Sequence, residues 1–291
     1  MSHIPVLLNE AIEMLHPKPG DFMIDGTIGE GGHAKEIIKH IEPNGIFLGI
    51  DWDKNQTKKA KQNISGVSTK VVIAEGNYRD IPDIQKRYGL PMADGLLLDL
   101  GFSSAHLRSG RGFSFQKDEP LDMRYNEKSG GETAREALQN LKEGEIADIL
   151  STYGEEKRAR EIARRIVEAR KKKRLETTMD LVRLIGEKRT GKIHPATRTF
   201  QALRMYVNKE LENLEEVLKS LPLVLTHGGR AAIITFHSLE DRMVKQAFRV
   251  YEDKGIGKRI HKKVIKPSRE EVLQNPRSRS AKLRGFLLTN N

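Results

Sequence analysis

The feature that most constrains the fold is a glycine-rich segment, residues 25–33, which reads DGTIGEGGH. It lies between a short apolar run, residues 22–24, and a stretch from residue 33 to 41 whose apolar residues share one helical face. Glycines at such a position let the backbone turn tightly and let a ligand approach without a clash with a Cβ atom. The helix beyond offers free N–H groups and a partial positive charge. A strand, a glycine-rich turn and a helix in this order predict a nucleoside-binding site.

Apolar segments alternate with helical patterns on both sides of this turn. Strands are predicted at residues 22–24, 45–50, 71–74, 95–98 and 230–236, with two candidate edge strands at 259–266 and 282–288. Helices are predicted between them, at residues 7–15, 33–41, 53–64, 208–221 and 239–250. Because the first strands are continuously apolar, both faces of the sheet must be covered. The pattern predicts an α/β fold with a parallel, doubly wound sheet.

Residues 107–205 interrupt this pattern and contain no convincing strand. Helical periodicity recurs there at residues 133–141, 145–151, 155–173 and 179–187. The chain of 291 residues is long enough for two domains. We therefore predict an all-helical domain, residues 107–205, inserted into an α/β domain made of residues 1–106 and 206–291.

Charge is distributed unevenly along the chain. The net charge of +11 divides into −3 for residues 1–106, +7 for 107–205, −2 for 206–253 and +9 for 254–291. A mildly acidic core with basic attachments suggests a small-molecule site carried by a polyanion-binding protein. The longest basic run, residues 170–174, reads RKKKR. Its alternative interpretation is a solvated helix end, because four glutamates lie along the same helix.

The acidic residues near the turn favour one type of nucleoside ligand. Asp51 ends the second predicted strand 20 residues after Gly31, where a carboxylate accepts hydrogen bonds from a ribose diol. Residues 29–34 also fit the dinucleotide fingerprint. Asp25, however, would repel a pyrophosphate and could hold the ammonium of an amino acid. S-adenosylmethionine carries that ammonium, a ribose and a sulfonium without any phosphate, so we favour it over a nicotinamide dinucleotide.

Two further residues follow predicted strands. Asp99 ends the fourth strand, and ligands of open α/β sheets bind beyond the carboxyl ends of the strands where the strand order reverses. We expect Asp99 to face the reactive end of the cofactor; the alternative is a cap for the next turn. Tyr78 follows the third strand and could line the adenine pocket or lie on the surface.

Several site classes are excluded or discounted. The chain has no cysteine, which excludes disulfides, thiolate zinc sites, iron–sulfur clusters and a cysteine nucleophile. The absence of an H-E-x-x-H motif predicts no metal site built by the protein. Residues 186–193 nearly spell a P-loop but lack the Ser or Thr after Lys192, and His237-Ser238 has no G-x-S-x-G context. Without a signal peptide or an apolar run of roughly 18 residues, we expect a cytoplasmic protein that contacts no membrane.

The chain resembles the RsmH (MraW) family, bacterial 16S ribosomal RNA methyltransferases that act on cytosine N4. The resemblance is carried, in order, by residues 25–34 (DGTIGEGGHA), 97–104 (LLDLGFSS), 111–115 (RGFSF), 120–124 (PLDMR), 194–202 (HPATRTFQA), 236–242 (FHSLEDR) and 275–280 (NPRSRS). It implies a Rossmann-like, S-adenosylmethionine-dependent methyltransferase with a helical insert for substrate recognition. Its partner would be the decoding (P-site) region of 16S rRNA in the small ribosomal subunit, and the oligomeric state, including a homodimer, stays open.

The resemblance also implies roles for particular residues. Cofactor contacts are expected from Gly31, Gly32, His33, Asp51, Tyr78, Asp99 and His106, to which the residue arguments add Asp25 and Gly29. RNA contacts are expected from Asp122, Arg124, Arg198, His237 and Arg277. Asp99 is the expected catalytic residue, because an acceptor on the amine hydrogens would favour rehybridisation of the target nitrogen.

The absent cysteine agrees with methylation of an amine, because methylation of cytosine at C5 commonly relies on a cysteine nucleophile. A base presented to the cofactor needs a pocket and an unstacked nucleotide, for which Phe102, Phe113 and Phe115 are candidate stacking surfaces or core residues. Two other classes stay open. A dinucleotide oxidoreductase would bind NAD and no RNA, and a non-catalytic RNA-binding or assembly factor would bind RNA without turnover.

Overall fold

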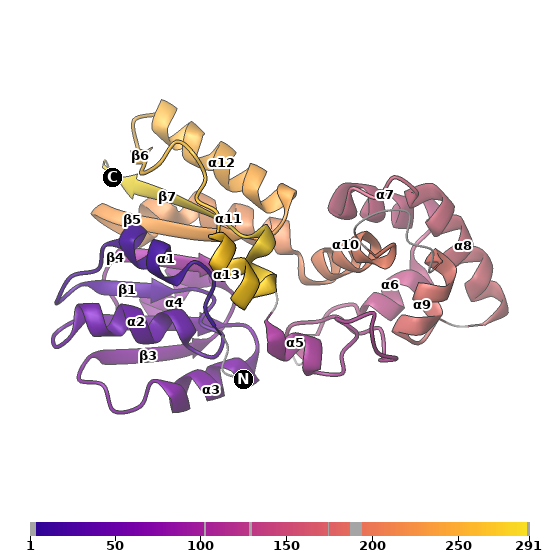
Figure 1. Cartoon of the computed structure of the whole chain (residues 1–291), viewed down its shortest axis with the longest axis horizontal. Coiled ribbons are helices and arrows are strands. Elements are labelled where there is room, and N and C mark those ends of the chain that lie inside the picture. The colour runs from indigo at the N-terminus through magenta and orange to yellow at the C-terminus, as the bar shows by residue number, and fades with distance from the viewer. Residues whose placement is uncertain (1–3, 102, 128–129, 174, 187–193, 290–291) are drawn as a thin grey trace. The chain divides into compact units, whose positions relative to one another are not determined.

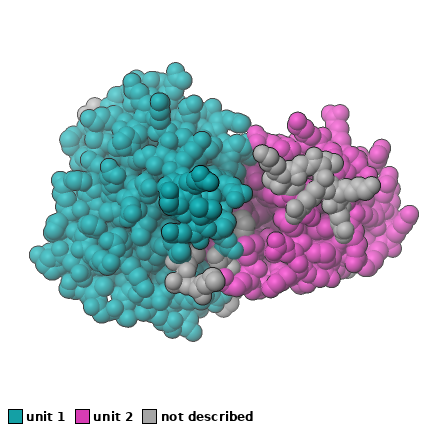
Figure 2. All heavy atoms as spheres, in the orientation of Figure 1, with its two compact units in different colours: residues 1–101, 211–291 teal, residues 102–210 magenta. Residues whose placement is uncertain are grey.

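The computed structural model describes residues 4–101, 103–127, 130–173, 175–186 and 194–289. The chain divides into two compact units, Met1–Gly101 with Leu211–Asn291, and Phe102–Glu210 (Figure 2). The divisions thus lie about five residues from those expected from the sequence, at 106/107 and 205/206. As a result His106, expected in the α/β domain, belongs to the second unit.

The first unit is built on a seven-stranded sheet in the order β3-β2-β1-β4-β5-β7-β6 (Figure 1). Its strands are β1 (Phe22–Asp25), β2 (Ile46–Asp51), β3 (Lys70–Glu75), β4 (Ala93–Asp99), β5 (Leu225–Thr235), β6 (Gly257–Arg259) and β7 (Lys282–Leu288). The first five strands are parallel, while β7 runs antiparallel to both β5 and β6. The predicted doubly wound α/β sheet is confirmed.

Of the two predicted edge strands, the first corresponds to β6 and lies at the edge of the sheet as expected, whereas the second does not. The second, β7, lies between β5 and β6 instead of at the edge. The first is only Gly257–Arg259, and Ile265 forms an isolated bridge to Leu283. Parallel neighbouring strands need a crossover connection, whereas antiparallel ones do not. A strand that runs in the opposite direction, such as β7, can therefore pair between β5 and β6.

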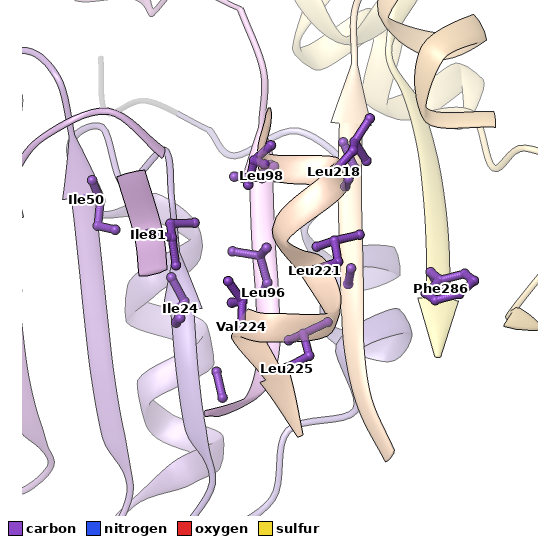
Figure 3. Packing of buried hydrophobic residues seen from close by; sticks show 14 of the residues in the cluster. Ile24, Ile50, Ile81, Leu96, Leu98, Leu218, Leu221, Val224, Leu225 and Phe286 are labelled. Carbon is purple, nitrogen blue, oxygen red and sulfur yellow. The ribbon is translucent and has the colours of Figure 1, made fainter. Parts of the chain in front are cut away.

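Helices cover both faces of the sheet because alternate side chains of each strand point to opposite faces. On one face, Leu96 and Leu98 of β4 belong to a core with α4 (Ile81–Arg87), α11 (Glu210–Val224) and α12 (Ser238–Asp253) (Figure 3). On the other face, Leu97 belongs to a core with α1 (Leu8–Leu15), α2 (Gly32–Ile41) and α3 (Lys54–Asn63). The continuous apolar run of β4 is therefore buried on both sides.

The second unit is helical and has its own core. Its helices are α5 (Ser104–Arg108), α6 (Ala134–Asn140), α7 (Glu143–Gly154), α8 (Ala159–Lys172), α9 (Thr178–Ile185) and α10 (Ala196–Asn208). Helix α10 was not expected from the sequence, because its buried face includes polar side chains. Arg204, for example, is buried in a bidentate pair with Glu210, at 2.8 and 2.9 Å.

Helix α13 (Arg269–Gln274) and a short 3₁₀ helix, Pro276–Ser280, precede β7 in the first unit. Among the described residues, no helix is long and apolar enough to cross a membrane.

Candidate functional site

The carboxyl edge of the sheet carries an acid on each of four neighbouring strands. In sheet order these are Glu75 on β3, Asp51 on β2, Asp25 on β1 and Asp99 on β4, each the last residue of its strand. The strand order reverses between β1 and β4, which is where open α/β sheets bind ligands. A row of carboxylates at that point favours a cationic ligand and disfavours a pyrophosphate.

The glycine-rich turn after β1 is tied to this edge. Gly29 donates its N–H to Asp51 Oδ2 at 2.9 Å, and Ile28 donates to the carbonyl of Ile50. Gly29 has φ +52°, and a Cβ atom placed on it would have only the Thr27 carbonyl within 4 Å. There is thus open space beside Gly29, and its expected contact with a ligand stays a prediction.

Gly31 and Gly32 are needed for a different reason. Gly31 has φ +87°, and an added Cβ would lie 3.1 Å from Ile64 Cδ1. A Cβ on Gly32 would lie 2.7 Å from Pro5 Cγ. At these two positions the glycines let the protein pack tightly against the turn, so their expected contact with the cofactor stays a prediction.

Asp51 is half-buried and uses both carboxylate oxygens to organise the backbone. Its Oδ2 accepts from Gly29, and its Oδ1 accepts from the N–H of Asp53 at 2.8 Å. Each carboxylate oxygen can accept more than one hydrogen bond. Asp51 therefore retains acceptor capacity for a ribose diol while holding the turn in place.

Asp25 is almost completely buried at the end of β1, with 2% of its surface exposed. Burial, together with the nearby charge of Asp51, raises the pKa of its carboxyl to about 7, although hydrogen bonds from the Thr27 N–H and hydroxyl work in the opposite direction. Thr27 also accepts from the Asp99 N–H through Oγ1, at 2.6 Å. Thr27 thus links the ends of β1 and β4, a role that the sequence analysis missed.

Asp99 ends β4 beside two other acids, Asp25 and Glu240. Burial raises its pKa well above the usual range, and the charges of Asp25 and Glu240 add to this effect. Among the described residues, its Oδ1 is buried and has no hydrogen-bond partner, while its Oδ2 lies 3.8 Å from His33 Nδ1. The cap of the following helix, α5, is supplied by Ser103. A buried acceptor without a partner at the switch point is a candidate for contact with a reacting group.

Glu240 lies in the first turn of α12, the helix that follows β5. It is buried and accepts from the Phe236 N–H through Oε2 at 2.9 Å, while its Oε1 lies 3.1 Å from His237 Nε2. His237 caps α12 through its ring Nδ1, which accepts from the Glu240 N–H. His237 was expected to contact substrate; the structure shows its capping role, and the substrate contact stays a prediction. The sequence analysis assigned no role to Glu240.

Tyr78 begins a short 3₁₀ helix, Tyr78–Asp80, that directly follows Asn77 after β3. Its Cβ would lie 3.2 Å from a Cβ placed on Gly26, so the tyrosine borders the turn after β1. This is the neighbourhood expected for an adenine pocket, and its contact with adenine stays a prediction.

The remaining predicted contacts belong largely to the second unit. The His106 ring is buried beside the rings of Phe113 and Tyr125, with centroids 5.2 and 4.8 Å away. Asp122 and Arg124 neutralise each other in a bidentate pair at 2.8 and 2.7 Å. Phe113 is buried as core, and Phe115 stacks on His194. Arg198 on α10 is half-buried, whereas Arg277 in the first unit is exposed.

The structure describes only part of two features noted in the sequence, the basic run at residues 170–174 and the P-loop-like segment at residues 186–193. In the basic run at 170–174, Arg170 donates to the Leu138 carbonyl and Lys173 lies 3.6 Å from Asp180, while Lys171 and Lys172 are exposed. Arg174, Phe102 and all but the first residue of the P-loop-like segment 186–193 lie outside the described residues.

The sheet order, the glycine-rich turn and the acidic carboxyl edge define a Rossmann-like methyltransferase fold. The model of the MraW methylase family matches residues 1–287, so the chain belongs to that family. A relative from Coprothermobacter proteolyticus is 47% identical over 98% of this chain and 96% of its own length. One from Thermotoga neapolitana is 46% identical over 97% and 94%. Both relatives carry the name ribosomal RNA small subunit methyltransferase H.

Proposed function

We propose that this protein transfers a methyl group from S-adenosylmethionine to the exocyclic N4 amine of a cytidine in the decoding (P-site) region of 16S rRNA in the small ribosomal subunit. Relatives of matching length support the coarser part of this proposal, because they are named as small-subunit rRNA methyltransferases. The observation that carries the choice of an amine substrate is Asp99, whose buried Oδ1 has no partner among the described residues.

The acidic edge fits the cofactor. S-adenosylmethionine carries positive charge on its ammonium and sulfonium, and Asp25, Asp51 and Asp99 end three adjacent strands. Asp51 would accept from the ribose hydroxyls, and the carboxylate of Asp25 would hold the ammonium. The open face at Gly29 leaves space for the bound molecule. When bound, the cofactor supplies an electrophilic methyl group.

Asp99 would hold the target amine. The lone pair of an exocyclic cytosine amine is partly delocalised into the ring, so the nitrogen must rehybridise before it attacks. A hydrogen bond from the amine to Asp99 Oδ1 would favour that change and would fix the nitrogen at a near-attack distance of about 3–3.5 Å from the methyl carbon. The chain has no cysteine, so it has no thiolate for covalent attack on the cytosine ring.

The C-terminal segment before β7 would bind phosphates of the RNA. This segment has few acidic residues. Its exposed cationic side chains are Lys254, Lys258, Lys262, Lys263, Lys266, Arg269, Arg277 and Arg279. Such a surface attracts a polyanion without regard to sequence. It would supply affinity, while the acidic edge of the sheet supplies the chemistry.

The proposal is tested by incubating the purified protein with labelled S-adenosylmethionine and immature small ribosomal subunits, followed by mass spectrometry of the nuclease fragments. We expect one methylated cytidine, modified at N4, within the decoding region of 16S rRNA. A methyl group on carbon, on ribose or on another RNA would refute the proposed specificity. Binding of the RNA without methyl transfer would favour the non-catalytic alternative.

A further inference from the structure

His33 is buried at the start of α2, and its two ring nitrogens face different groups. Nε2 lies 3.0 Å from the Val6 carbonyl oxygen, and Nδ1 lies 3.8 Å from Asp99 Oδ2. A carbonyl oxygen can only accept a hydrogen bond, so Nε2 must carry the hydrogen. In the neutral imidazole, Nδ1 is therefore the nitrogen that can accept a proton.

The orientation of this ring is built into the fold by the N-terminal segment, residues 4–7. Leu7 donates its N–H to Glu271 Oε1 at 2.8 Å, and Asn275 Nδ2 donates to the Ile4 carbonyl at 3.2 Å. Glu271 lies in α13 and Asn275 directly follows that helix, so both contacts attach the N-terminal segment to this part of the first unit. The Val6 carbonyl is thereby held in position against the His33 ring.

The groups that face Asp99 come from three elements. Asp25 at the end of β1 and Glu240 at the start of α12 are acids, and both raise the pKa of the Asp99 carboxyl. His33 on α2 is the base among these three neighbours. The two acids favour uptake of a proton by Asp99 from a substrate amine, and the imidazole of His33 is the basic group beside Asp99 to which that proton can be passed.

We propose that His33 is the positioning residue that accepts a proton from Asp99 during methyl transfer, an inference that rests on the proposed function. The amine nitrogen forms a bond to the methyl carbon, and the carbon–sulfur bond breaks with its electron pair remaining on sulfur. The proton released by the nitrogen moves to Oδ1 of the Asp99 carboxylate; the carboxyl group then rotates so that this oxygen faces Nδ1 of His33, which takes up the proton. The products are a methylated amine, a thioether, an Asp99 carboxylate and an imidazolium.

The geometry agrees with this sequence of steps. The imidazolium would keep its Nε2–H bond to Val6, and its charge would be compensated by the acids around Asp99. The distance of 3.8 Å between Nδ1 and Oδ2 must close by about 1 Å for direct proton transfer. The rotation of the protonated Asp99 carboxyl group toward His33 would supply that change.

The test compares His33→Gln with His40→Gln, a matched change at an exposed position of the same helix. The glutamine amide at position 33 can still donate to the Val6 carbonyl but cannot take up a proton. With S-adenosylmethionine and RNA at saturating concentrations, we expect a single-turnover methylation rate at pH 7 that falls about tenfold or more. The difference in methylation rate between His33→Gln and the wild type should become smaller toward pH 9, where hydroxide from the solvent can remove the proton. His40→Gln should behave like the wild type.

A rate for His33→Gln within about twofold of wild type at every pH would overturn the proposal. A deficit that stays constant across pH would overturn it as well, because a purely structural defect would not respond to proton availability. Should His33→Gln not fold, ¹⁵N NMR of the wild type decides: the proposal requires hydrogen on Nε2, and hydrogen on Nδ1 alone contradicts it. A wild type without methylation activity would instead refute the proposed function.

Discussion

The pKa of Asp25 makes cofactor binding pH-dependent in a defined direction. In the ligand-free protein this pKa is raised to about 7, so the carboxyl is largely protonated below neutral pH. The cofactor ammonium selects the carboxylate, and binding must therefore displace a proton at low pH. Affinity for S-adenosylhomocysteine should rise about tenfold per pH unit below pH 7 and level off above it. At pH 6 it should be about tenfold below its plateau.

Calorimetric titration of S-adenosylhomocysteine between pH 5.5 and 8 measures this dependence. Asp25→Asn removes the titrating group and one charge-assisted hydrogen bond, so affinity at pH 8 should fall by about 1.5–3 kcal/mol and lose most of its pH dependence. Glu75→Gln is the matched control, because Glu75 ends β3 on the same edge but is exposed. A wild-type affinity that does not change with pH, or an Asp25→Asn curve parallel to the wild type, would refute the reasoning.

Three other perturbations follow from the same contacts. Asp51→Ala removes the acceptor for the ribose diol and the anchor of Gly29, and should weaken binding of S-adenosylhomocysteine by about 1.5–3 kcal/mol in calorimetry; unchanged affinity would contradict the assignment. Replacing Lys171, Lys172 and Lys173 by alanine should reduce the slope of log RNA affinity against log salt concentration by about 0.7–0.9 per lost phosphate contact, with cofactor affinity unchanged. If the plots for the wild type and the triple variant coincide, the three lysines face water. Arg204→Ala leaves Glu210 buried without its bidentate partner and should lower the free energy of unfolding by about 3–5 kcal/mol in denaturant titrations, whereas a loss below about 1 kcal/mol would show that the pair contributes little.

The central elements of the fold could be predicted because their signals are local. The apolar run of β4 is buried on both faces, and the glycine-rich turn joins a strand to a helix, so both features leave a pattern in the sequence. Asp51 could be placed at the site because the end of its strand and its spacing from Gly31 are visible in the sequence. The parallel sheet then brings the ends of β1, β2 and β4 to one edge.

Other features depend on contacts that the sequence does not reveal. Val6 contacts His33 across 27 residues, and Glu240 approaches Asp99 only after β5 has paired with β4. Helix α10 lacks clear periodicity because Arg204 and Asn208 are buried through pairing with other polar groups. The place of β7 between β5 and β6 likewise follows from pairing, because a strand at the edge and a strand inside the sheet can share one pattern.

The most direct test of the account is the single-turnover rate of cytidine methylation with Asp99→Ala and Asp99→Asn, measured together with RNA affinity. If Asp99 holds the target amine, Asp99→Ala should lower the rate about 100-fold or more while RNA affinity stays within about twofold of wild type. Asp99→Asn should be milder, because its amide oxygen can still accept a hydrogen bond from the amine. A near-normal rate for Asp99→Ala would contradict the account and leave the Asp99 carboxyl with a structural role only.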